Sequence, residues 1–338
     1  MDTASPYQFS IILPVRNGGE YLKTCVQSIL SQTITDFDLS ILDSGSTDGT
    51  IEWLSTLKDP RIKTYLSGEP LTITQNWDRI KTIPRNTWMT IIGHDDVLFP
   101  YYLEQMTALI RQHPDASLYQ AHFNLIDAAG KFLRPCKPMP EKETAQELLD
   151  KILHNQVNLY GTGFMMRTVD YDRAGGIPLF PNLLSADHVL WLKLSSMAYL
   201  AVSPQTCFAY RINQSTTITT KSQIYIAALK MFVAYLLQEK NILAPAETQN
   251  EYVKRIFRFY CKRVSRRLVT EKLEKRDNLT VSVFLKETEG YAKQFLDNGE
   301  SFDPSKITDV WIAKMIDTNS ISRSYFQFLK RVHPNPFI

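Results

Sequence analysis

The sequence predicts an α/β fold, a doubly wound and mainly parallel sheet followed by a mostly helical C-terminal extension. Over roughly the first 100 residues, short β-rich apolar runs alternate with segments whose apolar residues recur at helical spacing. Turn-forming residues follow the apolar runs, as at Asn17 and Gly18. This alternation indicates parallel strands joined by right-handed helical crossovers. Sheets of this class hold ligands at the carboxyl ends of their strands.

The predicted elements can be placed one after another along the chain. The first strand is expected at residues 9–15, where FSIILPV ends in the turn signal of residues 16–19. Further strands are expected at 37–42, 61–66 and 88–92, and helices at 20–32, 51–57 and 72–80. This order places Asn17, Asp43 and Asp95 at one edge of the sheet, where its strands end.

Composition narrows the class of protein. The 338 residues are 44% hydrophobic and 22% charged, which is typical of a soluble globular chain. A net charge of +3 is too small to indicate a nucleic-acid partner. No leader segment and no apolar run of ~18 residues is found, so a cytoplasmic location is expected. The four cysteines lack metal-binding spacing and are expected to be reduced.

Two adjacent carboxylates follow the predicted strand at 88–92, in the stretch IIGHDDVLFP. Asp95 and Asp96 at the end of a buried strand would cost free energy unless something neutralised them. A divalent cation that also contacts substrate phosphates is one neutraliser. The alternative is a solvated turn or a helix cap, since Asp is common at both.

The opening forty residues and several later motifs resemble a known family. Residues 9–50 match, in order, the apolar strand, P-x-Y-N, S-I-L-x-Q-T and V-D-D-G-S-T-D-x-T of the family 2 glycosyltransferases with the GT-A fold, which is Rossmann-like. IGHDDVLFP stands in place of the metal-binding D-x-D segment, and residues 161–167, 175–176 and 185–192 resemble the acceptor-side half. Residues 210–213 (YRIN) resemble the closing Y-R-x-H motif. The resemblance implies a catalytic domain at 1–220, with a nucleotide-sugar half at about 8–100 and an acceptor half at about 101–220. The helical region at 221–338 lies outside it.

The resemblance implies a nucleotide pocket lined by Pro14, Arg16, Asn17, Asp43 and Asp95. Asp43 would accept a hydrogen bond from the base or ribose, and its alternative role is a turn or helix cap. Arg16 stands where the family usually has Tyr, and a guanidinium can stack on a base or reach a phosphate.

The family also implies a metal at the acidic loop. Asp95 and Asp96 would hold Mn²⁺ or Mg²⁺ together with the oxygens of the donor's diphosphate. Gly93 replaces the first Asp of D-x-D, and Ser44 replaces the second Asp of V-D-D. Each replacement removes one carboxylate that could make a contact in the family's site.

Asp187 occupies the position of the family's general base, near the start of a predicted helix. Its alternative role is the N-cap of that helix. Ala186 replaces the Glu that normally precedes the base. The side chains named for the diphosphate or the acceptor are Arg211, Asn213, Trp191 and His188, with Asn213 standing where the family has His. A core position is favoured for Trp191 over a sugar platform, and a structural role is the alternative for His188.

The function implied is inverting glycosyl transfer from a nucleotide-diphosphate sugar, with a UDP-sugar favoured. The acceptor would be a hydroxyl of a saccharide or lipid-linked saccharide in cell-surface polysaccharide assembly. One alternative is a degenerate relative that binds nucleotide or polysaccharide without turnover, which Gly93, Ala186 and Asn213 favour. A sugar nucleotidyltransferase is less favoured, because RNGG is a poor substitute for its Gly-rich loop.

The last third contains a basic amphipathic segment. Residues 252–268 place apolar side chains on one face and seven Lys or Arg elsewhere. Such a helix suits peripheral contact with the inner face of an anionic membrane, where lipid-linked acceptors would be presented. Packing of its apolar face within the protein is the alternative. A preceding helix is expected at 224–239, and Pro245 separates the two.

Overall fold

The structure, a computed structural model, describes residues 8–212 and 220–332. Internal contacts divide the chain into two compact units, Met1–Ile218 and Thr219–Ile338, and each is described by itself. No helix among the described residues has both the length and the apolar character that a membrane span requires.

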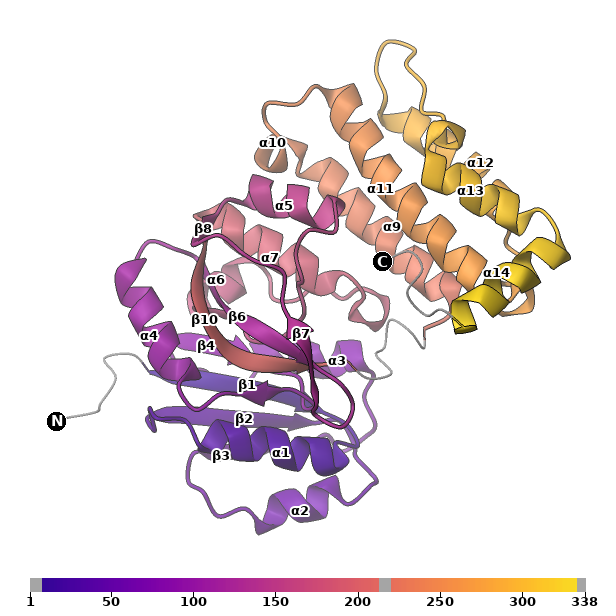
Figure 1. Cartoon of the computed structure of the whole chain (residues 1–338). Helices are drawn as coiled ribbons and strands as arrows, with labels where there is room; N and C mark the ends of the chain where they lie inside the picture. The colour runs from indigo at the N-terminus through magenta and orange to yellow at the C-terminus, as the bar shows by residue number, and fades with distance from the viewer. Residues whose placement is uncertain (1–7, 213–219, 333–338) are drawn as a thin grey trace. The chain divides into compact units, whose positions relative to one another are not determined.

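The first half of the N-terminal unit confirms the predicted alternation of strands and helices. Its parallel strands lie side by side in the order β3, β2, β1, β4 (Figure 1). All seven residues of β1 are buried, as expected of a central strand that is covered on both faces. The elements are β1 (Phe9–Val15), α1 (Gly19–Leu30), β2 (Phe37–Asp43), α2 (Thr50–Thr56), β3 (Ile62–Tyr65), α3 (Ile73–Asp78) and β4 (Trp88–Ile91).

The second half of the sheet is mixed, while most paired residues of the sheet as a whole are in parallel pairings, as the sequence predicted. The short strand β9 (Met165–Arg167) inserts antiparallel between β4 and β6 (Leu118–Ile126). β10 (Leu200–Arg211) then runs parallel to β6. Three short strands complete the sheet in antiparallel pairings: β5 (Val97–Leu98) and β8 (Lys142–Glu143) on β10, and β7 (Phe132–Pro135) on β6.

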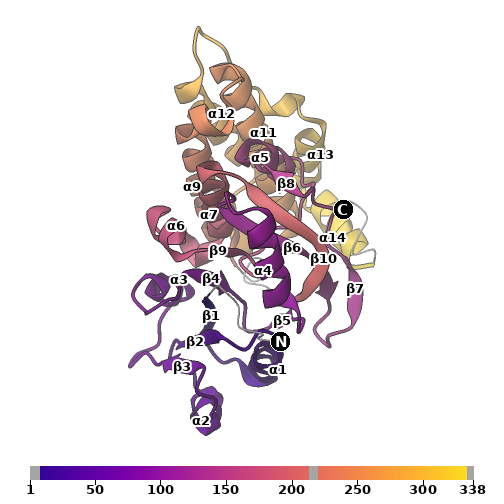
Figure 2. The ribbon, with the colours of Figure 1, turned by 90° about the vertical axis from the view of Figure 1, so that its left-hand side faces the viewer.

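Among the residues that the structure describes, four α-helices belong to this second half. They are α4 (Tyr102–Gln112), α5 (Ala145–Leu153), α6 (Thr168–Arg173) and α7 (Ala186–Met197). α4 packs on β6 and β10, and Figure 2 shows it in front of these strands. The antiparallel pairing of β5 with β10 brings the loop that follows β4 against the end of β10. This pairing positions the acidic loop.

The described part of the C-terminal unit is helical. α11 (Gln249–Thr270) packs against α9 (Ser222–Gln238), α12 (Val281–Ala292), α13 (Thr308–Asp317) and α14 (Ser320–Val332). The short α10 (Lys240–Leu243) precedes the break at Pro245, which the sequence predicted. The apolar residues of α11 are buried among these neighbouring helices. The apolar face of residues 252–268 is therefore not available to lipid, and membrane contact through the exposed basic side of this helix stays a prediction.

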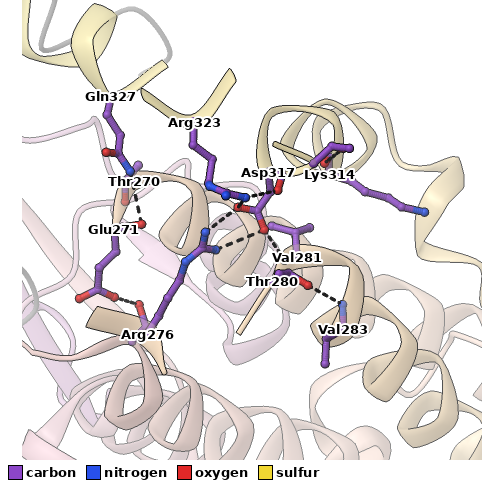
Figure 3. Close-up of polar contacts among 12 residues, drawn as sticks. Thr270, Glu271, Arg276, Thr280, Val281, Val283, Lys314, Asp317, Arg323 and Gln327 are labelled. Carbon is purple, nitrogen blue, oxygen red and sulfur yellow. Dashed lines mark hydrogen bonds and ion pairs between the residues drawn. The ribbon is translucent and has the colours of Figure 1, made fainter. Parts of the chain in front are cut away.

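A buried ion pair ties the last helices together (Figure 3). The Arg276 guanidinium, which is fully buried, donates to Asp317 Oδ1 over 2.5 Å, and the Val281 amide donates to Asp317 Oδ2 over 2.7 Å. Arg323 Nη1 donates to the Asp317 carbonyl over 2.6 Å. The end of α13 is thereby fixed to the start of α12 and to α14.

Candidate active site

The loops after β1 and β2 hold each other in place. Asn17, at a positive φ of 52°, donates its amide to Ser46 Oγ over 2.8 Å and accepts from the Thr47 amide over 2.9 Å. The Arg16 side chain is exposed, and its Nη1 lies 3.4 Å from the Leu71 carbonyl oxygen. Pro14 is buried within β1. The residues predicted to line the nucleotide pocket therefore lie on or next to two loops at the strand ends, and these interlocked loops are hydrogen-bonded to each other.

Asp43 is fully buried at the end of β2 and caps its own turn. Its Oδ1 accepts from the amides of Gly45 at 2.8 Å and Ser46 at 3.1 Å, and its Oδ2 accepts from the Ser46 hydroxyl. These bonds give Asp43 the turn-capping role that the sequence left open. A carboxylate oxygen has lone pairs for further donors. A contact with the nucleotide therefore stays a prediction.

Two side chains at the end of α3 donate hydrogen bonds to backbone carbonyls at the strand ends. Asn76 Nδ2 donates to the Leu42 carbonyl over 2.8 Å. Arg79 donates to the carbonyls of Asp43 and Tyr65, each over 2.8 Å. Backbone groups at strand ends that lack sheet partners are satisfied in this way. Residues 75–77 resemble the helix that precedes the D-x-D segment in the family, but that resemblance did not indicate these backbone contacts.

The acidic loop folds its two carboxylates around Gly93. A Cβ placed on Gly93 would lie 2.8 Å from Asp96 Oδ2 and 3.1 Å from Asp95 Oδ1. Asp96 is buried, whereas Asp95 is half-buried. Thr162 accepts from the Gly93 amide over 3.2 Å and hydrogen-bonds to the Asp96 carboxylate. Glycine at this position lets both carboxylates approach one point.

Burial and the adjacent charge of Asp95 raise the pKa of Asp96 well above the ordinary carboxyl value. Burial also lowers the pKa of His94, which favours a neutral imidazole between the strand and the carboxylates. A cation beside the pair would relieve the repulsion between the two carboxylates. The electrostatics of this loop therefore favour a bound positive charge.

Arg211, the last residue of β10, clamps the acidic loop. Its amide donates to Asp96 Oδ1 over 2.9 Å and its Nε donates to the Asp95 carbonyl over 2.7 Å. Nη1 donates to the carbonyls of Asp127 and Ala128, at 3.1 and 3.2 Å. The structure thus gives Arg211 a positioning role. Its contact with the diphosphate stays a prediction.

Asp187 lies in the first turn of α7 and is half-buried. Its Oδ1 accepts from the His188 amide over 2.9 Å. A Cβ placed on Gly161 would lie 3.9 Å from the Asp187 Cβ and 3.3 Å from the Trp77 ring. The start of α7, the loop before β9 and the end of α3 therefore meet beside Asp187.

A pair of stacked tyrosines lies near the carboxylates of the acidic loop and near Asp187. The sequence reasoning did not single this pair out. Tyr160 and Tyr210 stack with ring centroids 3.6 Å apart and 3° between the rings. Burial raises the pKa of Tyr210, and the charges of Asp96, Asp95 and Asp187 raise it further. Tyr210 is thus close to both carboxylate groups. It belongs to the YRIN motif, so the signal was present in the sequence.

Packing places one of the predicted acceptor-side residues, Trp191, in the core. Trp191 is 1% exposed, stacks on Phe164 with ring centroids 4.1 Å apart, and donates to the Tyr160 carbonyl over 3.2 Å. It is therefore a core residue rather than an acceptor platform. His188 is half-buried next to Asp187. Asn213 lies outside the described residues.

The metal prediction depends on how many oxygen ligands the acidic loop can supply. Among the residues that the structure describes, no three His, Cys, Asp or Glu side chains gather as a metal site. Mg²⁺ takes about six oxygen ligands, of which Asp95 and Asp96 can supply two. The pair therefore fits a divalent cation only if substrate oxygens and water complete the coordination.

The segment that carries the two interlocked loops and the acidic loop is similar in sequence to known glycosyltransferases. The sequence model of Glycosyl transferase family 2 matches residues 10–173, which include both interlocked loops and the acidic loop. This segment belongs to glycosyl transferase family 2. An uncharacterized glycosyltransferase of Rickettsia typhi is 24% identical over 258 residues, which cover 73% of this chain and 78% of that protein. A PGL/p-HBAD biosynthesis glycosyltransferase of Mycobacterium bovis is 33% identical over 119 residues, 32% of this chain and 44% of its own.

Solved structures confirm the GT-A fold. TarS residues 1–349 of S. aureus, in complex with UDP-GlcNAc, match this chain with a TM-score of 0.60 at 14% identity. The match covers 91% of each chain. At this identity the likeness shows the fold, and the fold alone does not establish the substrates.

Proposed function

We propose that this family 2 glycosyltransferase inverts the anomeric centre while it transfers a sugar from a nucleotide-diphosphate donor to a saccharide hydroxyl. The observation that supports the proposal is the stacked pair Tyr160–Tyr210, in which Tyr210 lies close both to the carboxylates of the acidic loop and to Asp187. A donor diphosphate at the acidic loop and an acceptor hydroxyl at Asp187 would then meet beside these rings.

Asp187 would act as the general base. The acceptor oxygen forms a bond to the anomeric carbon, the bond from that carbon to the diphosphate oxygen breaks, and Asp187 takes the hydroxyl proton. Attack from the face opposite the leaving group inverts the anomeric configuration. Its half-buried position leaves the Asp187 carboxylate reachable by an acceptor.

Asp95 and Asp96 would hold Mn²⁺ or Mg²⁺ together with diphosphate oxygens. When bound, such a cation stabilises negative charge on the departing diphosphate. Asp96, fixed by the Arg211 amide and Thr162, would set the position of the loop, while the more exposed Asp95 would face the donor.

A UDP-sugar is the donor that we infer, because two of the matching TarS structures are complexes, one with UDP-GlcNAc and one with UDP. Pro14, Arg16, Asn17 and Asp43 would line the nucleotide pocket. The acceptor would be a saccharide or a lipid-linked saccharide at the cytoplasmic side of cell-surface polysaccharide assembly. The mycobacterial relative, named for PGL/p-HBAD biosynthesis, supports a role in building a glycoconjugate.

The first experiment is calorimetric titration of UDP, GDP, CDP and dTDP into the full chain, with and without Mn²⁺. We expect UDP to bind most tightly and Mn²⁺ to strengthen its binding. Asp95→Asn should remove most of the Mn²⁺ effect, whereas the exposed and distant Asp115→Asn should not. Equal binding of all four nucleotides would contradict the donor proposal.

The second experiment tests the base. Asp187→Asn should lower transfer at least ~100-fold while UDP affinity stays within about twofold, because general-base catalysis contributes roughly that much. Transfer at the wild-type rate would remove Asp187 from the role. NMR of the product anomer reads the stereochemistry, and retention would contradict inversion.

The degenerate alternative is favoured by two replacements, Gly93 for the first Asp of D-x-D and Ala186 for Glu. It predicts tight nucleotide binding with neither transfer nor hydrolysis for any UDP-sugar. Product formation from one donor is enough to exclude it.

A further inference from the structure

Two consecutive helices of the C-terminal unit turn apolar faces to solvent. On α13, Trp311 is 51% exposed and Met315 52%, and on α14, Ile321 is 81% exposed and Phe328 60%. The spacing of three or four residues places the apolar side chains of each helix on one face. A helix at a protein surface normally shows its polar side to water. The exposed set, called here the outer apolar face, consists of Trp311, Ile312 and Met315 of α13 with Ile321, Tyr325 and Phe328 of α14.

The opposite sides of the two helices are firmly anchored. Val310 and Ala313 of α13 are buried, and Asp317 at its end accepts from the buried Arg276 (Figure 3). On α14, Arg323 donates to the Asp317 carbonyl, and Gln327 Nε2 donates to the Glu271 carbonyl over 3.4 Å. Rotating either helix to hide its apolar side chains would break these contacts. The outward direction of the face is therefore set by the fold.

A basic stripe borders the outer apolar face. Arg258, Lys262 and Arg266 recur every four residues on α11, and all three are exposed. Lys262 Nζ lies 3.0 Å from Asp309 Oδ2 in the first turn of α13, so the stripe runs beside that helix. Residues 219–338 contain 20 Lys and Arg against 13 Asp and Glu, whereas residues 1–218 contain 18 against 22. The basic excess of the chain is thus confined to this unit.

We propose that the outer apolar face and the basic stripe form a peripheral docking surface for a bilayer that contains anionic lipid. Exposed Trp, Tyr, Phe, Ile and Met side chains gain free energy by entering the boundary between headgroups and acyl chains. Arg and Lys beside them attract anionic headgroups, each by about 1 kcal/mol near the surface. Nucleic acid would use the basic stripe and leave the apolar side chains in water.

Charge also favours a bilayer over a second copy of the chain as the partner of this surface. A symmetric contact places the same patch of both copies together. Two outer apolar faces in contact would bring their bordering basic stripes near each other, with repulsion between like charges. Anionic headgroups meet the same stripes with attraction. This docking surface stands independently of the proposed transfer reaction.

The test is sedimentation of the full chain with vesicles of phosphatidylcholine alone or mixed with phosphatidylglycerol. We expect binding to the mixed vesicles that weakens at high salt, and little binding to phosphatidylcholine. Ile321→Ser, Tyr325→Ser and Phe328→Ser together should weaken binding at least tenfold without changing charge. The control pair Met231→Ser and Val283→Ser removes exposed apolar side chains from α9 and α12 and should leave binding within twofold.

A second readout locates the contact. Lipids with bromine on their acyl chains should quench Trp311 fluorescence in the wild type, and Trp311→Phe should remove the quenching. Since every substituted side chain is exposed, the far-UV circular dichroism and unfolding midpoint should not change. Equal vesicle binding by the triple variant and the wild type would overturn the proposal. So would concentration-dependent self-association in sedimentation velocity that the triple variant abolishes, because the face would then be a contact between copies.

Discussion

Replacing Arg211 by Met tests whether this residue is a clamp or a phosphate ligand. The guanidinium donates to three backbone carbonyls, lies 4.6 Å from the Tyr21 ring centroid and belongs to a residue that is 5% exposed. Hydrogen bonds from a charged donor contribute about 1 kcal/mol or more each, and a cation–π contact about 0.5–2 kcal/mol. Arg211→Met should therefore lower the free energy of unfolding by roughly 3–5 kcal/mol.

The assay is urea unfolding followed by tryptophan fluorescence, because four of the five tryptophans lie before residue 219 and report on the N-terminal unit. The exposed Arg111→Met is the matched control and should change the free energy of unfolding by less than about 0.5 kcal/mol. Arg211→Lys keeps the charge and should fall between the two. The reasoning is refuted if Arg211→Met unfolds within ~1 kcal/mol of the wild type but binds UDP much more weakly.

Two further substitutions test the loop and its neighbours. Asp96→Asn keeps an acceptor for the Arg211 amide and removes a carboxylate whose pKa is raised by burial and by Asp95. The wild type loses stability as the pH rises through that raised pKa, so the variant's advantage in urea unfolding should grow from pH 4 to pH 8, to at least ~1 kcal/mol; an advantage that does not grow contradicts the assignment. In Gly163→Ala the new Cβ would lie 2.6 Å from the Phe208 ring at a residue whose φ is 73°. In Gly175→Ala the φ is 82°, and the new Cβ would meet no atom within 4 Å. Differential calorimetry should show a loss of ~3 kcal/mol or more for the first and about 1–2 kcal/mol for the second, and equal losses would mean that the Phe208 ring moves freely aside.

The strands and helices in the first half of the chain could be predicted because the signals for them lie in neighbouring residues. β1 and β2 are apolar runs closed by turn residues, and the observed bounds, Phe9–Val15 and Phe37–Asp43, differ from the predicted ones by at most one residue. The short antiparallel strands in the mixed half of the sheet could not be predicted in this way. β9 has three residues and β5 has two, which is too short for an alternation signal.

Individual roles at the site depended on partners far away in the sequence. The YRIN motif indicated that Arg211 matters, but only the antiparallel pairing of β5 with β10 shows that it holds the acidic loop 116 positions earlier. Trp191 had the residue type of a sugar platform, and packing on Phe164 places it in the core. A motif names a residue, whereas its contacts come from how distant segments meet.

The sequence by itself determined the fold class, the family and the position of the carboxylates at the strand ends, because periodicity, turn chemistry and motif order are properties of neighbouring residues. The tertiary structure decided which apolar faces are covered. The apolar face of α11 is buried by surrounding helices, while α13 and α14, whose inner sides are held by Arg276 and Asp317, leave theirs exposed. Amphipathic spacing gives the same signal in both cases, since it records that a helix has an apolar side and not what that side meets.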